Sequence, residues 1–316
     1  GSYREFLAKI NLTSGIGNLA LDFKMDKQDQ LSVFKGLINA QGLDIGTFAN
    51  ASNIIGTIDL DPQVSGKAKS FSDISLDIEG DAYNAQLLEN SIDDIKLNGT
   101  YSEKQFVGLV NIKDNELDLD FNGLVNFADP KSPIGDFSAR INHADFNGLN
   151  LMHSDSTIII SSNITANMVG FNLDKMEGTL SLDSTRLVYG NEVYEMNALD
   201  VNIVNDNLMQ RRFNVDCDFF NYEMAGLIDF ASMGNAFKTL LDQYGSMPRW
   251  EKDIERYKKQ KNIKEQDFFV NLTITNPDPL TKLFMPALRI AKNTTLNGTY
   301  TSRSNMINLT LRSKKV

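Results

Sequence analysis

The sequence predicts an all-β protein: a curved antiparallel meander with a short helical insertion. The first observation is an alternation of apolar and polar residues with a period of two, which is typical of strands with one buried face. The second is the succession of short polar turns between these runs. The third is a glycine that recurs on the apolar face, including in both copies of the pentapeptide LNGTY, at 97–101 and 296–300.

The alternation is clearest in the segment ELDLDFNGLVNF at 116–127. Leu117 and Leu119 fall on one face of this predicted strand, and Asp118 and Asp120 fall on the other. Similar runs along the chain predict roughly sixteen strands, mostly joined as hairpins. The sheet is therefore expected to be antiparallel and meandering.

Eight glycines stand in line with the apolar residues of their strands rather than in turns. A glycine inside a strand has no side chain to pack, so its recurrence on one face predicts a bend or a close approach of backbones. Glycine kinks are one means of curving a sheet. The predicted groove-bending glycines are Gly36, Gly80, Gly99, Gly108, Gly123, Gly178, Gly226 and Gly298.

The apolar face of such a sheet must be covered in some way. A closed barrel, a two-sheet sandwich and an open gutter that holds apolar guests would each cover it, and the pattern alone leaves these three open. The residues predicted to line this face are Phe34, Ile38, Ile78, Leu97, Tyr101, Phe106, Val110, Leu117, Leu119, Phe121, Val125, Phe127, Leu180, Met224, Ile228, Phe230, Leu296 and Tyr300.

Composition and motifs exclude several classes of function. A net charge of -10 and a pI near 4.8 disfavour nucleic acid as a partner. His143 and His153 lie far apart without a metal-binding motif, so no metal site and no cofactor are expected. The chain also has no nucleophile elbow and no phosphate-binding glycine loop. We therefore expect a protein that is not an enzyme and has no catalytic residues.

The domain organisation is predicted to be simple. Residues 1–18 form an N-terminal lead-in that begins with a tag scar, Gly-Ser, and residues 19–316 form one continuous β segment. Two short amphipathic helices are expected at about 235–266, and another short helix is expected after Asp278, its candidate N-cap. No apolar run reaches the ~18 residues of a membrane span, so the fragment is expected to be soluble.

Two motifs carry a resemblance to a known family. The segment DNELDLDFNG at 114–123 is similar to a family pattern DxNxxLxFxG with its second Asn offset by one, and LFMPALRIAKNTTLNGTY at 283–300 fits a closing LFxPxLxIxxxTxLxGxY. In these motifs, and over about residues 20–313, the chain resembles the periplasmic part of TamB-type proteins of the AsmA superfamily. The resemblance implies a β-taco, an open U-shaped groove with an apolar interior.

The resemblance also implies a function. The groove is expected to hold phospholipid acyl chains within a periplasmic bridge that carries phospholipid between the inner and outer membranes and supports outer-membrane biogenesis. The full-length protein would be anchored to the inner membrane, and a TamA/BamA-type outer-membrane barrel would be its partner through parts absent from this chain. The alternative is a β-sandwich interaction or scaffold module for outer-membrane protein assembly or adhesion, with a dry packed core in place of a lipid-filled channel.

Overall fold

The computed structural model of the 316-residue protein describes residues 5–28, 30–49, 52, 55–70, 73–87, 90–129, 131–152, 154–170, 172–205, 210–231, 233, 265–284, 288–304 and 306–314. Strands account for 70% of the residues and helices for 5%, which confirms the predicted all-β class. The predicted helical insertion at 235–266 lies, apart from Glu265 and Gln266, outside the described residues.

Twenty strands and two helices occur in the described part of the chain. The strands are β1 (Glu5–Ser14), β2 (Gly17–Gln28), β3 (Leu31–Asp44), β4 (Thr57–Leu60), β5 (Gln63–Ala68), β6 (Ile74–Tyr83), β7 (Ala85–Leu87), β8 (Asn90–Ile92), β9 (Ile95–Ser102), β10 (Gln105–Lys113), β11 (Leu117–Asn126), β12 (Ile134–Asp145), β13 (Ile158–Val169), β14 (Glu177–Tyr189), β15 (Glu192–Asn205), β16 (Arg211–Cys217), β17 (Phe220–Leu227), β18 (Asp267–Ile274), β19 (Thr294–Thr301) and β20 (Met306–Arg312). The helices are α1 (Ile45–Ala49) and α4 (Pro277–Phe284).

Eighteen of the strands belong to one sheet, while β7 and β8 pair with each other as a separate hairpin. The chain divides into two compact units. The first unit comprises Gly1–Asn167 and Leu182–Met196, and the second comprises Met168–Ser181 and Asn197–Val316.

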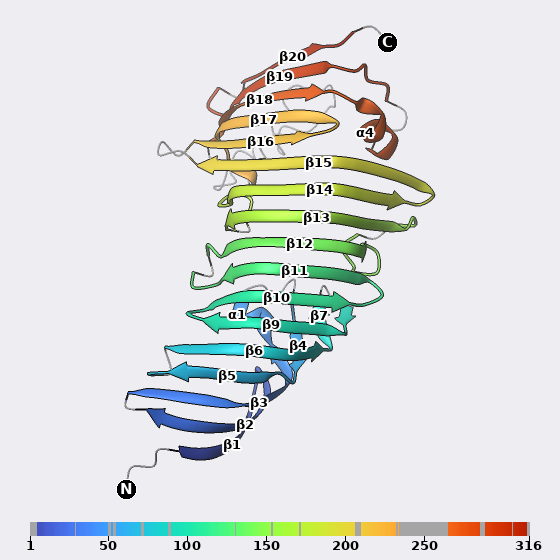
Figure 1. Ribbon diagram of the computed structural model, residues 1–316. Helices are drawn as coiled ribbons and strands as arrows, with labels where there is room; N and C mark the ends of the chain where they lie inside the picture. The colour runs from blue at the N-terminus through green and yellow to red at the C-terminus, as the bar shows by residue number, and fades with distance from the viewer. Residues whose placement is uncertain are drawn as a thin grey trace, which may run out of the picture. The chain divides into compact units, whose positions relative to one another are not determined.

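In the first unit the strands β1, β2, β3, β5, β6, β9, β10, β11 and β12 follow one another, each antiparallel to the next (Figure 1). The short strand β4 pairs with the ends of β3 and β6. The register places apolar residues opposite apolar residues, since Val110 lies opposite both Leu97 and Phe121. Each strand of this meander therefore contributes alternate residues to one shared apolar face.

In the second unit the last residues of β15 pair with β16, and β16 to β20 continue in sequence order, each antiparallel to the next. The predicted helix after β18 is confirmed as α4, but its predicted start was wrong, because α4 begins at Pro277 and Asp278 lies inside it. Proline suits the first turn of a helix because its missing N–H would have no partner there. Asp278 instead places a negative charge near the positive end of the helix dipole.

The opposite, polar face of the first unit is tied together by hydrogen bonds between strands. Asn142 Nδ2 donates to Asp118 Oδ1 over 2.9 Å, and Lys113 Nζ donates to the same oxygen over 2.6 Å. The bond from Asn142, followed by the bond and charge of Lys113, lowers the pKa of the Asp118 carboxyl below its usual value. Asp118 thus stabilises the folded state as a carboxylate.

We expect Asp118→Asn to reduce stability at neutral pH by on the order of 1 kcal/mol or less, because the site is near the surface. A carboxyl whose pKa is lowered by folding stabilises above its unfolded pKa, near 3.9, and loses this effect as the pH falls through its folded pKa. The difference in unfolding free energy between the original protein and the variant should therefore be constant from pH 7 to about pH 5 and smaller at pH 3, as urea denaturation would measure. An equal difference at pH 7 and pH 3 would contradict this role of Asp118.

Candidate functional site

One end of the apolar face of the first unit is sealed by a compact core. This core cluster lies where β9 and β11 begin and β10 and β12 end, and residues of the hairpin β7–β8 and of the turn after β12 belong to it. Its buried members are Ala82, Ile92, Ile95, Ile112, Leu117, Ala144 and Leu149. Ile92 of the hairpin is 1% exposed, so water is excluded from this end of the face.

Farther along the same strands the apolar face is open. Phe106 lies opposite Tyr101 and Val125, and these three residues form a row across β9, β10 and β11. All three are half-buried, as is Phe121, and none of the four contacts the core cluster. The face therefore changes, within the length of a strand, from a dry core to accessible apolar side chains.

A ladder of glycines runs between the rows of this open face. Gly108 lies directly opposite Gly99 and Gly123, so three neighbouring strands have a glycine at the same level. A Cβ atom on Gly99 would lie 2.5 Å from the carbonyl oxygen of Val107 and 2.8 Å from the ring of Phe106. The space that a side chain would need is thus filled by the adjacent backbone and an aromatic ring, which is why these positions are glycine.

The same arrangement recurs at other levels of the sheet. The ring of Phe34 lies over Gly66 on the adjacent strand, where a Cβ atom would be 2.9 Å from ring atom Cζ. On the second unit, Gly226 lies opposite Phe268 and would bring a Cβ atom 2.7 Å from the Cα of Phe268. Gly66 was absent from the predicted set, although its place two residues after Val64 carried the same signal.

The predicted lining residues are distributed over both units. Those of the first unit are Phe34, Ile38, Ile78, Leu97, Tyr101, Phe106, Val110, Leu117, Leu119, Phe121, Val125 and Phe127. Those of the second unit are Leu180, Met224, Ile228, Phe230, Leu296 and Tyr300. In the first unit Leu117 belongs to the core cluster, and Leu97, Val110 and Leu119 pack against it, so they differ from the four open residues.

Two of the residues predicted to line a strand in the second unit lie elsewhere. The strand β17 ends at Leu227, and both Ile228 and Phe230 follow it. The ring of Phe230 packs edge-on against the ring of Phe213, with centroids 5.0 Å apart. The period-two pattern therefore continued in the sequence beyond the point where the strand stops.

A buried arginine, which the sequence analysis did not single out, lies on the apolar face of the second unit. Arg211 is 7% exposed and lies opposite Gly226. Its Nη1 donates to the backbone oxygen of Leu173 over 2.5 Å, and its Nη2 donates to that of Met176 over 2.6 Å. Burial lowers the pKa of this guanidinium, and two nearby carboxylates oppose that effect. Arg211 thus fastens the turn before β14 to the sheet.

A second polar contact closes the same end of the second unit. Gln266 is fully buried, and its Nε2 donates to the backbone oxygen of Asp229 over 2.9 Å, while its Oε1 accepts from the backbone N–H of Asp229 over 3.2 Å. The carboxylate of Asp174 accepts from the backbone N–H groups of Phe230 and Ala231. Gln266 and Asp174 thus hold the segment that follows β17 through its backbone groups.

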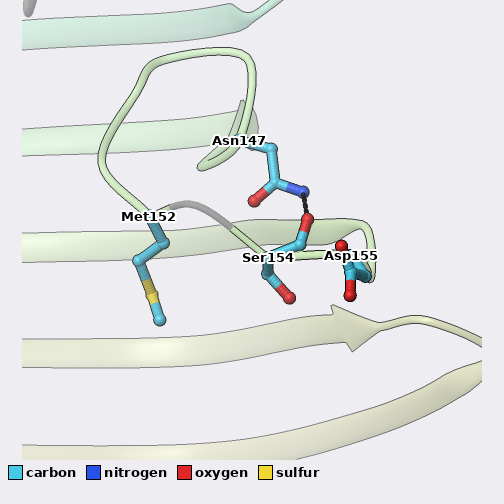
Figure 2. A pocket seen from close by; sticks show the side chains of 4 residues that line it. All are labelled: Asn147, Met152, Ser154 and Asp155. Carbon is cyan, nitrogen blue, oxygen red and sulfur yellow. Dashed lines mark hydrogen bonds between the residues drawn. The ribbon is translucent and has the colours of Figure 1, made fainter.

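A hollow of the first unit lies beside the turn after β12 (Figure 2). It has a volume of about 410 Å³ and is lined by Asn147, Met152, Ser154 and Asp155. Asn147 Nδ2 donates to the backbone oxygens of Ser154 and Ser156. Among the described residues that line this hollow, Asp155 is the one carboxylate, and the described residues contain no group of three or more acidic, histidine or cysteine side chains that could bind a metal.

Comparison of the chain with protein-family models, curated proteins and solved structures found no match. In the part of the chain that the structure describes, no helix combines the length and the apolar character needed to cross a membrane.

Proposed function

We propose that this chain binds phospholipid acyl chains along the apolar face of its sheet and that it is a segment of a lipid-conducting bridge. The observation that supports the proposal best is the open part of the face in the first unit, where Tyr101, Phe106, Phe121 and Val125 are half-buried in register. A domain that used this face only as its core would bury such residues as fully as it buries Ile112.

The chemistry of this face suits acyl chains rather than a specific small molecule. Each methylene removed from water contributes about 0.8 kcal/mol, whatever the identity of the apolar side chains that cover it. The aromatic and aliphatic rows provide such contacts across several strands, and the core cluster closes one end of them. A head group can stay in water and needs no pocket of its own.

The wider setting of the proposal comes from the family resemblance. A TamB-like bridge would place this segment in the periplasm, with an inner-membrane anchor and a TamA/BamA-type barrel contact in other parts of the full-length protein. Transport of phospholipid between the two membranes would then pass along the same apolar face. The acidic surface, with a net charge of -10, would help to keep such a segment in solution between the membranes.

Native mass spectrometry of the purified chain tests lipid binding directly. We expect phospholipid to be retained by the protein and to be displaced by an added fluorescent fatty acid. A chain that carries no lipid, and that takes up no fluorescent fatty acid from vesicles, would overturn the proposal and favour an interaction module with a dry core.

Two substitutions on β11 separate a binding face from a core. We expect Val125→Asp to leave the chain folded with a modest loss of stability, because the residue is half-buried and its new carboxylate can reach water, but to abolish lipid retention. Leu117→Asp on the same strand face should instead cost several kcal/mol, because a 7% exposed site in the core cluster would hold an unpaired carboxylate.

Circular dichroism with urea denaturation, together with lipid extraction and mass spectrometry, would measure both effects. If Val125→Asp unfolded the chain as Leu117→Asp does, the open face would be a core and the proposal would fail. Leu119 is less suitable for this test, because it packs against the core cluster.

A further inference from the structure

The polar face of the first unit has a shallow hollow that the lipid proposal does not use. It has a volume of about 330 Å³ and lies across β3, β5, β6 and β9. Two rows of side chains line it. The first row contains Lys35, Ser65, Asp77 and Thr100, and the second contains Gln63, Glu79 and Asn98.

The strand register brings these side chains together from segments far apart in the sequence. In the first row Ser65 lies opposite both Lys35 and Asp77. In the second row Glu79 lies opposite both Gln63 and Asn98. Neighbouring strands are about 4.8 Å apart and the two rows about 7 Å apart, so the polar groups form a regular two-row array.

Three polar side chains of the hollow differ from those on the neighbouring strands because they have no hydrogen-bond partner among the residues that the structure describes. On β10, β11 and β12 polar side chains bond one another, as Asp118 does with Asn142 and Lys113. In the hollow Thr100 donates to Asp77 over 2.8 Å. The side chains of Gln63, Glu79 and Asn98 make no hydrogen bond or ion pair with any residue that the structure describes, so their donors and acceptors are available to a ligand.

Exposed aliphatic side chains border the polar array at both ends. Leu37 is 54% exposed and lies opposite Gln63, at one end of the second row. Val107 and Leu109 are 43% and 50% exposed and lie opposite Thr100 and Asn98, at the other end. A ligand that spans the hollow would thus meet apolar surface, then amides and carboxylates, then apolar surface again.

We propose that this hollow binds a neutral oligosaccharide. The amides of Gln63 and Asn98 both donate and accept hydrogen bonds, and the carboxylate of Glu79 accepts them, which matches sugar hydroxyls that do both. The C–H faces of sugar rings suit the aliphatic borders. An anionic ligand is disfavoured, because two carboxylates face a single lysine in a chain of net charge -10. Strand faces of other small β folds bind oligosaccharides in a comparable way.

Saturation-transfer NMR on the whole chain, with cellotriose, maltotriose and chitotriose as probes, tests this proposal. We expect transfer from the protein to at least one trisaccharide, with a Kd on the order of 1 mM, because the hollow is open and lacks an aromatic platform. The double variant Glu79→Ala with Asn98→Ala should weaken this binding at least fivefold, as on the order of two hydrogen-bonding groups are lost.

Asn122→Ala is the matched control, because Asn122 is an exposed asparagine on the same face, opposite Leu109 and outside the hollow. It should leave binding unchanged, and circular dichroism should show all variants folded. The proposal is overturned if no trisaccharide receives saturation, if the double variant binds as the original chain does, or if spermidine binds in the hollow more strongly than every sugar. The sugar-binding measurement does not depend on whether the same samples retain phospholipid, so one proposal can fail while the other holds.

Discussion

Replacing Arg211 with methionine is expected to lower the free energy of unfolding by about 2 to 4 kcal/mol, because two backbone acceptors lose a charged donor at roughly 1 to 2 kcal/mol each. The substitution keeps an unbranched aliphatic stem beside the ring of Phe213, over which the guanidinium lies at 4.7 Å. It removes the donors that the backbone oxygens of Leu173 and Met176 use. Two part-buried acceptors left without a charged donor account for most of the expected cost.

The adjacent arginine offers a control that is exposed and bonds a carboxylate instead of backbone oxygens. Arg212 points to the other face of β16, where its Nη1 donates to Glu223 Oε1 over 2.7 Å and its side chain is 55% exposed. Arg212→Met should cost less than about 1 kcal/mol, as exposed ion pairs generally do. Arg211→Lys should fall between the two, because it keeps the charge but loses the planar fork that serves several acceptors at once.

Urea denaturation followed by circular dichroism would measure all three variants. Equal losses for Arg211→Met and Arg212→Met would show that the turn before β14 does not depend on the buried guanidinium. A loss confined to Arg211 would identify this side chain as the fastening between the turn and the sheet.

The strands and the glycine ladder could be predicted because both depend on local sequence. Alternation over about ten residues is enough to define a strand and its two faces, as at β11. The glycines carried a further signal, since Gly99, Gly108 and Gly123 each stand in the apolar register of a strand. The sequence did not indicate which glycines would lie opposite each other, because the register between strands depends on turn geometry.

The core cluster was harder to predict, because its cover consists of short elements. The strands β7 and β8 have three residues each, too few for a period-two pattern to show. The helix α1, which is not part of this cover, was also missed although a signal was present: Asp44 accepts from the backbone N–H and the hydroxyl of Thr47, an N-cap with Asp three residues before Thr. Without the cover, the sequence could not separate the sealed end of the apolar face from the open end.

The polar features of both units were missed for a different reason. Arg211 occupies a position where the alternation with Phe213 and Val215 calls for an apolar residue, and this mismatch was the available signal for a buried cation. The hollow across β3, β5, β6 and β9, which we propose as a sugar site, has no such signal. Its side chains come from strands between Lys35 and Thr100, and each strand alone looks like an ordinary solvated face.

The two copies of LNGTY provide the second large effect, because they place the same local sequence in different surroundings. Gly99→Ala is expected to cost about 3 kcal/mol, the upper part of the usual range for overpacking. The new Cβ atom would meet the backbone oxygen of Val107 at 2.5 Å and the ring of Phe106 at 2.8 Å. Backbone cannot yield without disturbing the pairing of β9 with β10.

Gly298→Ala should change stability by less than about 1 kcal/mol in either direction. Its Cβ atom would meet the terminal Cδ2 of Leu309 at 2.7 Å, and Leu309 is 62% exposed on β20, so the side chain can rotate away. The loss of glycine's freedom in the unfolded chain would offset part of the remaining cost. Urea denaturation of both variants measures the difference, and because the two pentapeptides are identical, strand propensity cancels between them. Equal losses of unfolding free energy in the two variants would mean that alanine is unfavourable in this strand sequence wherever it stands. The expected difference of about 2 kcal/mol or more would mean that Gly99 makes room for the neighbouring backbone and the ring of Phe106.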